Sequence, residues 1–560
     1  MSCQAAKQHV AKHRVAGRQR RGMLILVVLV IVLMLGVVAT GFLLDMQTEN
    51  LAARAANDEL AARQAALSAR ELLAAQIEMP RQARDEVGGW QGNSATLRDQ
   101  ILFAPEDSLN GAASSSGTES FSNGQLDNTT CRLAIGPWTS ARPNVDIHTD
   151  EVVTSAIECE SGKLNLLALL KWEESQPGLA RSCLQAIPGM TDDVMDQLLS
   201  APAHPMGPST TATTGSATTG PTTRASLSLW GTNGDTSATQ IDETAAISGS
   251  WTDQGTQVAQ HRWQDFLTVY SAERNEAYDG RPRVFVNSDN VSELYMQLRD
   301  RVSPEWAQFI VLYRQYGPGG SSGSVSGAGA LEPDLSIPLA HPISSIVELI
   351  GATVAVPQGA DTVTVASPID ETNLAGEVGL VRVADQLTTT PDRTIVGRVN
   401  VNKAPREVLL AIPGTDETIV DRIMSSRESS IDGPGNRIHE TWLLAEGLVD
   451  RQQMQDLLPY ITVGGDVFRA QVWGYFLDGT AVTGLEVVLD GSAGRTKQVF
   501  LRELYTADVR AALAVNYHQT MSAVGMSESP GAAHDSRVAK DRFSEPLGRD
   551  VRRSASAIGE

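Results

Sequence analysis

The hydrophobic pattern of the chain is dominated by one apolar run near its beginning. Residues 23–44 carry no charge, and at about 1.5 Å per residue a helix of this length reaches roughly 33 Å, enough to cross the hydrocarbon core of a membrane. Residues 45–79 contain no proline and no glycine and are rich in Ala, Leu, Arg, Glu and Gln, which favour helix. We therefore predict one continuous helix over 23–80, half inside a membrane and half outside it, which ends at Pro80.

The rest of the chain alternates between short strand patterns and short helical patterns, which predicts an α+β fold. A first β region lies within 81–163, where residues 131–135 and 151–157 have the composition of strands. A second lies within 464–510, where three strand-like runs separated by glycine turns predict an antiparallel meander. The three runs are 467–476, 485–489 and 498–504.

Three stretches interrupt this pattern because they contain few large apolar residues. Residues 205–256 are rich in Thr, Ser, Gly and Ala, which predicts a disordered insert, and residues 511–560 predict a disordered tail. The glycine-rich residues 317–330 predict a flexible linker. This linker belongs to a region over 301–395, in which Val-rich alternation between 348 and 385 predicts a small β element.

The strongest signal is an internal repeat of short strand, helix, tight turn and second helix. Its turns are Ile187-Pro188-Gly189, in a first helical unit over 164–300, and Ile412-Pro413-Gly414, in a second unit over 396–463. Glycine adopts backbone conformations that other residues disfavour, so Pro-Gly between two helical patterns predicts a helical hairpin. Residues 283–287 open a similar strand and helix. The repeat therefore predicts two hairpin units of the SAM-like kind.

Charge is distributed unevenly along the chain. The formal net charge is −21, yet residues 1–22 contain six cations and no acid. A basic leader before an apolar helix predicts that the leader stays in the cytoplasm and the acidic body lies across the membrane. Residues 394–463 contain seven basic and ten acidic side chains, and acids follow the turn at Gly414. Nucleic-acid binding is therefore not expected, because phosphates would face carboxylates.

The four cysteines are Cys3, Cys131, Cys159 and Cys183. Outside the cytoplasm one pair of the last three would be oxidised, and Cys131 with Cys159 is favoured because each lies in a strand-like run. No spacing of cysteine or histidine matches a metal site. No side chains form a catalytic triad or a carboxylate pair suited to acid–base work. We therefore expect no metal site and no enzymatic activity.

The beginning of the chain resembles a type IV prepilin or pseudopilin. The resemblance is carried by a short basic leader that ends in Arg-Arg-Gly22, followed by Met23 and the apolar helix. In that family a prepilin peptidase cuts after the glycine, which implies cleavage between Gly22 and Met23 and methylation of the new N-terminus. Most members carry glutamate at the fifth mature position, where this chain has Val27. The K-type minor pseudopilin also lacks this glutamate. An ordinary signal anchor that is never cut is the alternative.

The order of the later segments is similar to that K-type branch, the general secretion pathway protein K family of type II secretion. The similar stretches include KLNL, the two AIPG turns, GRVNVNKAPREVLLAIPG and ETWLLAEGLVDRQQMQDLLPYITV. The resemblance implies a transmembrane pseudopilin helix, a small antiparallel sheet, and a large α-helical domain of two SAM-like units inserted into that sheet.

The same resemblance implies a structural protein of the inner membrane with a single span and a periplasmic body. Such a protein caps the tip of the pseudopilus and helps to start its assembly for protein export across the outer membrane. The implied partners are the I- and J-type minor pseudopilins, the inner-membrane platform and the prepilin peptidase. The family allows bound calcium, although the resemblance identifies no ligands here. A membrane-anchored helix-hairpin-helix DNA-binding protein of the competence type and a membrane scaffold unrelated to secretion are the alternatives.

Overall fold

The structure is a computed structural model, in which the described residues are 7–86, 100–103, 131–136, 157–200, 263–319, 324–327, 331–359, 361–371, 374, 379–428, 437–507 and 509–515. For 7–25, 100–103, 200, 324–327 and 428 only the backbone is described. The insert predicted over 205–256, residues 516–560 of the predicted tail and residues 151–156 of a predicted strand lie outside these ranges.

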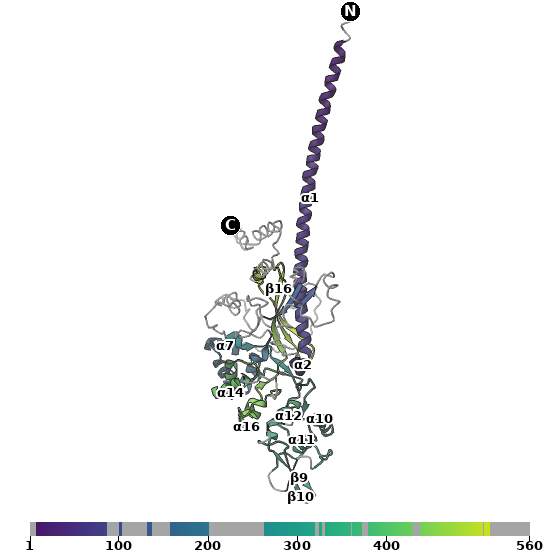
Figure 1. Cartoon of the computed structure of the whole chain (residues 1–560). Coiled ribbons are helices and arrows are strands. Elements are labelled where there is room, and N and C mark those ends of the chain that lie inside the picture. The colour runs from purple at the N-terminus through teal and green to yellow at the C-terminus, as the bar shows by residue number, and fades with distance from the viewer. Residues whose placement is uncertain are drawn as a thin grey trace, which may run out of the picture.

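One long helix, α1 (Lys7–Glu78), extends from one end of the molecule, and the body gathers around and beyond its C-terminal part (Figure 1). The helix predicted over 23–80 is confirmed. It begins earlier than predicted, because residues 7–22 also contain no proline that would break it. The helix ends before Pro80, which disfavours helical backbone at the residue that precedes it. A short helix, α2 (Arg81–Glu86), follows.

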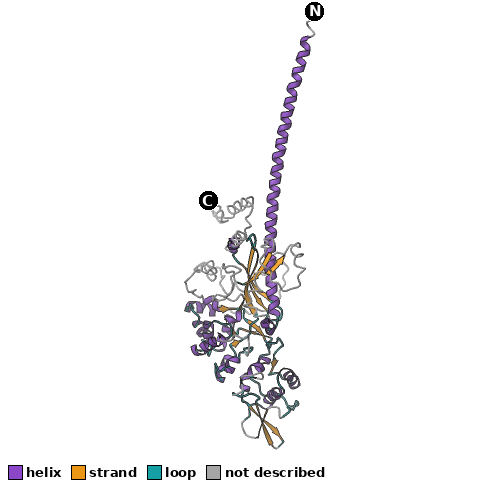
Figure 2. Cartoon of the chain, viewed as in Figure 1, coloured by secondary structure: helices purple, strands orange, loops and turns teal. Residues whose placement is uncertain are grey.

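The main sheet is antiparallel and lies against the C-terminal part of α1 (Figure 2). Its strands follow the order β1-β2-β15-β16-β17, with β3 paired to β15 beyond the end of β2. The strands are β1 (Gln100–Phe103), β2 (Cys131–Ile135), β3 (Ile157–Cys159), β15 (Val467–Phe476), β16 (Val482–Asp490) and β17 (Lys497–Glu503). The predicted meander is therefore confirmed as β15, β16 and β17.

Between β3 and β15 the chain folds into three consecutive modules, each closed by two short parallel strands that we call a clasp. In every clasp the threonine hydroxyl accepts a hydrogen bond from the backbone N–H two residues later, at 3.0–3.1 Å. Because the two strands of a clasp are neighbours, each module begins and ends at the same place. The clasps are β4 (Leu164–Asn165) with β5 (Leu267–Thr268), β7 (Val284–Phe285) with β11 (Leu387–Thr388), and β13 (Val399–Asn400) with β14 (Ile461–Thr462).

Helices fill the modules and supply most of the larger hydrophobic core, in which Trp306 and Trp442 are fully buried. The first module contains α5 (Leu166–Ser175), α6 (Leu179–Gln185) and α7 (Asp192–Ser200). The middle module contains α10 (Val291–Arg301), α11 (Pro304–Tyr316) and α12 (Leu380–Gln386). The third contains α13 (Arg406–Leu410), α14 (Glu417–Glu428), α15 (Trp442–Ala445) and α16 (Arg451–Leu457).

Small sheets and 3-10 turns complete the body. The middle module carries a sheet at the end of the molecule farthest from the N-terminus, where β9 and β10 are labelled (Figure 1). Its strands are β8 (Ser324–Gly327), β9 (Thr353–Gln358) and β10 (Asp361–Ala366). The links before and after the middle module pair as β6 (Ala272–Arg274) and β12 (Thr394–Val396). The 3-10 turns are η1 (Glu160–Gly162), η2 (Trp263–Phe266) and η3 (Ile346–Leu349).

The region over 301–395 differs from its prediction. Residues 301–388 belong to the middle module, which runs from β7 to β11, and residues 389–395 belong to the link that follows it. Residues 324–327 of the predicted linker form β8, which pairs in parallel with β10. The Val-rich alternation is a strand pair over β9 and β10, as predicted, but its last part is helix α12. There Leu380, Val381, Val383 and Ala384 are all buried, which is a helical spacing rather than the alternation of a strand.

Candidate functional site

The first half of α1 is the candidate membrane anchor. From Leu26 to Leu44 the helix is apolar and its side chains are exposed, and the most apolar stretch has a mean hydropathy of 3.0 with none of it buried against the body. Continuous apolar surface of this extent marks contact with a membrane or with a partner. The helix is long and apolar enough to cross a membrane.

The residues of the predicted cleavage site lie inside this helix. Gly22 and Met23 both have helical backbone, so a peptidase has to unwind α1 locally to reach the bond between them. Glycine is a weak helix former, which lowers the cost of such unwinding. Val27 lies just over one turn later with its side chain half exposed on the apolar surface. The Val27 side chain therefore faces outward, where a neighbouring helix can reach it.

The second half of α1 packs against the main sheet, mostly through small side chains. A stripe of buried residues faces β15, β2 and β16, and together with the sheet it forms the smaller core. These residues are Ala62, Ala65, Ala66, Ala69, Leu73 and Ile77. At the closest point, a Cβ atom added to Gly474 of β15 would lie 1.9 Å from the carbonyl oxygen of Ala62 and 2.7 Å from the backbone nitrogen of Ala66. Helix and sheet therefore touch backbone to backbone at Gly474.

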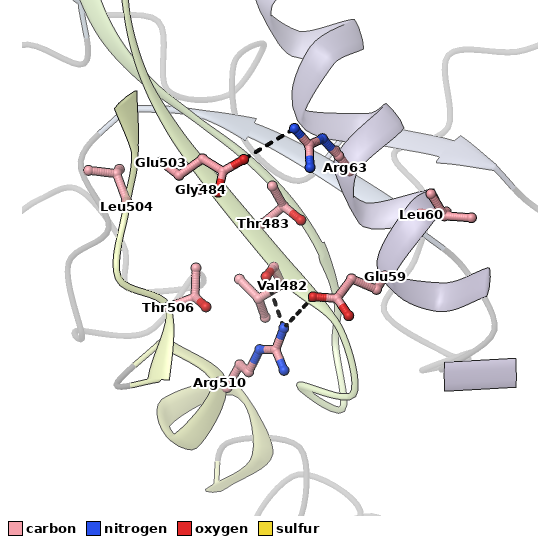
Figure 3. Close-up of a pocket in the computed structure, with 10 residues that line it drawn as sticks. All are labelled: Glu59, Leu60, Arg63, Val482, Thr483, Gly484, Glu503, Leu504, Thr506 and Arg510. Atoms are coloured by element: carbon pink, nitrogen blue, oxygen red, sulfur yellow. Dashed lines mark hydrogen bonds and ion pairs between the residues drawn. The ribbon is translucent and has the colours of Figure 1, made fainter. Parts of the chain in front are cut away.

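A cavity of about 230 Å³ lies beside this contact, between α1, the start of β16 and the residues after β17 (Figure 3). Two ion pairs cross it: Arg63 Nη2 lies 3.2 Å from Glu503 Oε1, and Arg510 Nη2 lies 3.6 Å from Glu59 Oε1. All four charged side chains of the wall are thus paired with one another. Both pairs are solvent-exposed, and such pairs stabilise a fold by only about 0–1 kcal/mol. The two ion pairs therefore contribute little to the attachment of α1 to the sheet.

The two predicted turns are helical hairpins of the same geometry. Gly189 and Gly414 have φ angles of 75° and 86°, the left-handed region that a Pro-Gly turn requires. The preceding Ile187 and Ile412 are buried, while Pro188 and both glycines are more exposed. The turns therefore present backbone at the surface, as hairpins that bind phosphate do.

Charged residues around these turns repeat as well. Arg181 lies six residues before Ile187 and contacts Asp196, nine residues after it; Arg406 and Asp421 stand at the same positions around Ile412. Each pair ties the first helix of a hairpin to the second. Asp416 caps α14, because its Oδ1 accepts a hydrogen bond from the Ile419 N–H at 2.7 Å. Carboxylates therefore occupy the places where a phosphate would lie, which opposes nucleic-acid binding.

The cysteine prediction is wrong. Cys131 pairs with Phe476 and Cys159 pairs with Phe468, so the two thiols lie eight residues apart along one edge of β15. At about 3.3 Å per residue this separation is roughly 26 Å, whereas the Cα atoms of a disulfide lie within about 7 Å. Cys131, Cys159 and Cys183 are all free and buried. Burial raises the pKa of each thiol to about 11, so all three stay protonated and unreactive.

Two buried titratable groups of the third module lie side by side just before α15. His439 lies beside Glu440, with 3.6 Å between Nε2 and Oε1. Burial lowers the pKa of His439 to about 3 in spite of this carboxylate. The His439 Nδ1 accepts a hydrogen bond from the Thr441 N–H at 3.3 Å, which places the proton of the neutral ring on Nε2. Over the described ranges no three His, Cys, Asp or Glu side chains are grouped to hold a metal ion.

Two features of the structure were missed by the sequence reasoning. The first is the closing strand of the middle module, Leu387–Thr388, although Leu267-Thr268 and Ile461-Thr462 close the other modules with the same pattern. That shared apolar-Thr pair is the signal that would have revealed a third copy. The second is Gly474, whose importance depends on the helix that crosses it and leaves no mark in the local sequence.

Comparisons of the chain with family models, with curated proteins and with solved structures gave no match. Its function therefore has to be inferred from its own residues and their geometry.

Proposed function

We propose that the chain is a K-type minor pseudopilin of a type II protein secretion system. In this role it is a structural subunit without enzymatic activity, which caps the tip of the pseudopilus and helps to start its assembly for export across the outer membrane. The observation that carries the proposal is α1, a 72-residue helix. Its first half is exposed and apolar, and its second half is seated on an antiparallel sheet.

The arrangement of the body supports a position at the tip. The three modules are inserted into the sheet between β3 and β15. They gather beside and beyond the C-terminal end of α1, with β9 and β10 of the middle module farthest out (Figure 1). In a fibre built from helices packed side by side, a subunit with such a bulk at that end fits only where no further subunit is stacked above it. Val27 agrees with this position, because a tip subunit has no neighbour above that demands the usual glutamate contact.

The charge pattern supports an inner-membrane protein with its N-terminus in the cytoplasm and its body in the periplasm. Six cations and no acid precede the apolar segment, which favours retention of the leader on the cytoplasmic side. The partners of such a subunit are the prepilin peptidase, the inner-membrane platform, and the I- and J-type minor pseudopilins. The tip complex would form by association of their transmembrane helices and their seated sheets.

Co-expression with a prepilin peptidase tests the proposal directly. Intact-mass and N-terminal peptide measurements should find a new, methylated N-terminus at Met23. The matched control is Gly22→Leu, which keeps the apolar helix and the basic leader but changes the residue before the cut, and it should remain uncut. If the wild-type leader stays attached in cells that process a known prepilin, the protein is a signal-anchored scaffold and the proposal fails.

Co-purification gives a second, independent readout. Tagged chain expressed with I- and J-type minor pseudopilins should be recovered with both in detergent, whereas a major pseudopilin expressed at the same level should not be retained. Recovery of the chain without either partner would contradict a place in the tip complex even if the leader is cut.

A further inference from the structure

The modules are joined to the sheet by only two stretches of chain, and these stretches touch. The first is Glu160–Lys163, between β3 and β4, and the second is Val463–Asp466, between β14 and β15. A Cβ atom added to Gly465 of the second would lie 2.6 Å from the sulfur of Cys159 and 2.9 Å from the hydroxyl of Ser161, beside the first. Two adjacent links of this kind form a hinge unless other contacts restrain them.

The first link carries a fully buried carboxylate that bridges sheet and module. Glu160 is 0% exposed. Its Oε1 accepts a hydrogen bond from Arg469 Nε of β15 at 2.7 Å, and its Oε2 accepts one from the hydroxyl of Thr268 in the first clasp. Arg469 in turn donates to Glu486 of β16 at 2.9 Å. One carboxylate therefore ties two strands of the sheet to the closing strand of the first module.

The second link carries another buried carboxylate, which reaches α1 and α2. Asp466 Oδ1 accepts hydrogen bonds from Arg84 Nη2 at 2.8 Å and from Arg274 Nη2 at 3.2 Å, and its Oδ2 accepts one from the Arg274 N–H at 2.8 Å. The Arg274 guanidinium also donates to the carbonyl oxygens of Ile77 and Met79, at 3.3 and 3.2 Å. Asp466 thus holds the end of α1, the short helix α2 and the exit of the first module together.

Both carboxylates are ionised at neutral pH. Burial by itself raises the pKa of each, but Arg469 beside Glu160, and Arg84 and Arg274 beside Asp466, outweigh it and lower both pKa values below the ordinary range. A buried ion pair of this kind adds little net stability, because the cost of desolvating both charges offsets their attraction. Without the Asp466 charge, Arg84 and Arg274 lose the carboxylate that joins them to the second link. Without the Glu160 charge, Arg469 keeps Glu486 but loses its ion pair to the first link.

We propose that Glu160 and Asp466 lock the three modules, from β4 to β14, against α1 and the main sheet, so that the two parts move as one rigid body. The two links then act as fixed joints rather than as a hinge. The far sheet of β9 and β10 keeps a defined position relative to the axis of α1. This inference does not depend on the pseudopilin proposal, because it concerns only how the body is coupled to its helix.

Distance measurement between two spin labels tests the lock in the full chain, purified in detergent. The labels are placed at Gln64→Cys on α1 and Thr418→Cys on α14, both exposed positions, in a Cys3→Ser background. A chain without the introduced cysteines shows that the three buried thiols stay unlabelled. Double electron–electron resonance should give one narrow distance distribution. In the Asp466→Asn and Glu160→Gln variants, singly and together, the distribution should become at least about twice as broad.

Controls separate unlocking from unfolding. Asp196→Asn removes an exposed carboxylate that contacts Arg181 in the first module and should leave the distribution narrow. A second label pair, Gln64→Cys with Lys497→Cys on β17, should stay narrow in all variants, because α1 and the sheet keep their own core. An unchanged α1-to-α14 distribution in the double variant would overturn the proposal. Equal broadening of both label pairs would overturn it as well, because the carboxylates would then hold the sheet itself.

Discussion

Replacement of Gly474 by alanine tests whether α1 lies as close to the sheet as the structure places it. The added methyl carbon would lie 1.9 Å from the carbonyl oxygen of Ala62, whereas carbon and oxygen atoms that are not bonded stay about 3.3 Å apart. The helix would have to move away by roughly 1.4 Å. Overpacking costs about 1–3 kcal/mol, and we expect about 3 kcal/mol here because backbone atoms cannot rotate out of the way as a side chain does.

Hydrogen–deuterium exchange of the detergent-solubilised chain measures this effect where it occurs. A loss of about 3 kcal/mol corresponds to roughly a hundredfold faster exchange in residues 62–77 and in β15, since each tenfold change is about 1.4 kcal/mol. Gly162→Ala is the matched control: its methyl carbon would lie 3.6 Å from the Lys403 carbonyl oxygen, an ordinary contact, and exchange should change little. Unchanged exchange in Gly474→Ala would refute the backbone contact between helix and sheet.

Three further predictions follow from buried or exposed groups. Because burial lowers the pKa of His439 from 6.5 to about 3, the unfolded chain binds a proton that the folded chain does not. The free energy of unfolding should therefore fall by about 1.4 kcal/mol between about pH 7.5 and pH 5.5. In chemical denaturation at both pH values, His439→Gln should lose this part of the pH dependence. The same pH dependence in the wild type and the variant would show that His439 is not the group responsible. Cys131, Cys159 and Cys183 should resist alkylation in the native chain and react after denaturation, whereas a cross-linked Cys131–Cys159 peptide in mass spectrometry would show that the strand register is wrong. The chain should not bind short duplex DNA at low salt, because Asp416 and neighbouring carboxylates lie at the turn. If the chain does bind such DNA, and Gly414→Asp abolishes the binding, the DNA-binding alternative would be supported instead.

Elements with a long and distinctive composition could be predicted from the sequence. The apolar run before Asp45 is uninterrupted, and β15 is a ten-residue run rich in valine and aromatic side chains, so that local pattern and tertiary position agree. The Ile-Pro-Gly turns were predictable for a different reason, because a glycine with positive φ leaves a residue-specific signal. These features define the anchor, the meander and two of the three hairpin modules.

Pairings between distant strands were not predictable. The repeat marked the opening strand of each module, but a clasp strand is only two residues long and its partner lies roughly 60 to 100 residues away, so no local pattern shows which strands pair. Helix α12 has the composition of a strand. Its buried residues, however, are the neighbours Leu380 and Val381 and the neighbours Val383 and Ala384, a spacing that places all four on one face of a helix. The position of Cys131 and Cys159 along the same edge of β15 likewise depends on register, which composition does not encode.

The clasps have a consequence for how such a chain can change in evolution. The first and last strands of each module are paired with each other, so the module is connected to the rest of the chain at two adjacent points. This holds whatever the length of the segment between the two strands. The entropy of closing a loop grows only slowly with its length, so lengthening one module disturbs the others little. Each module is in effect a cassette, which duplication can copy and deletion can remove while the helix and its sheet keep their connections.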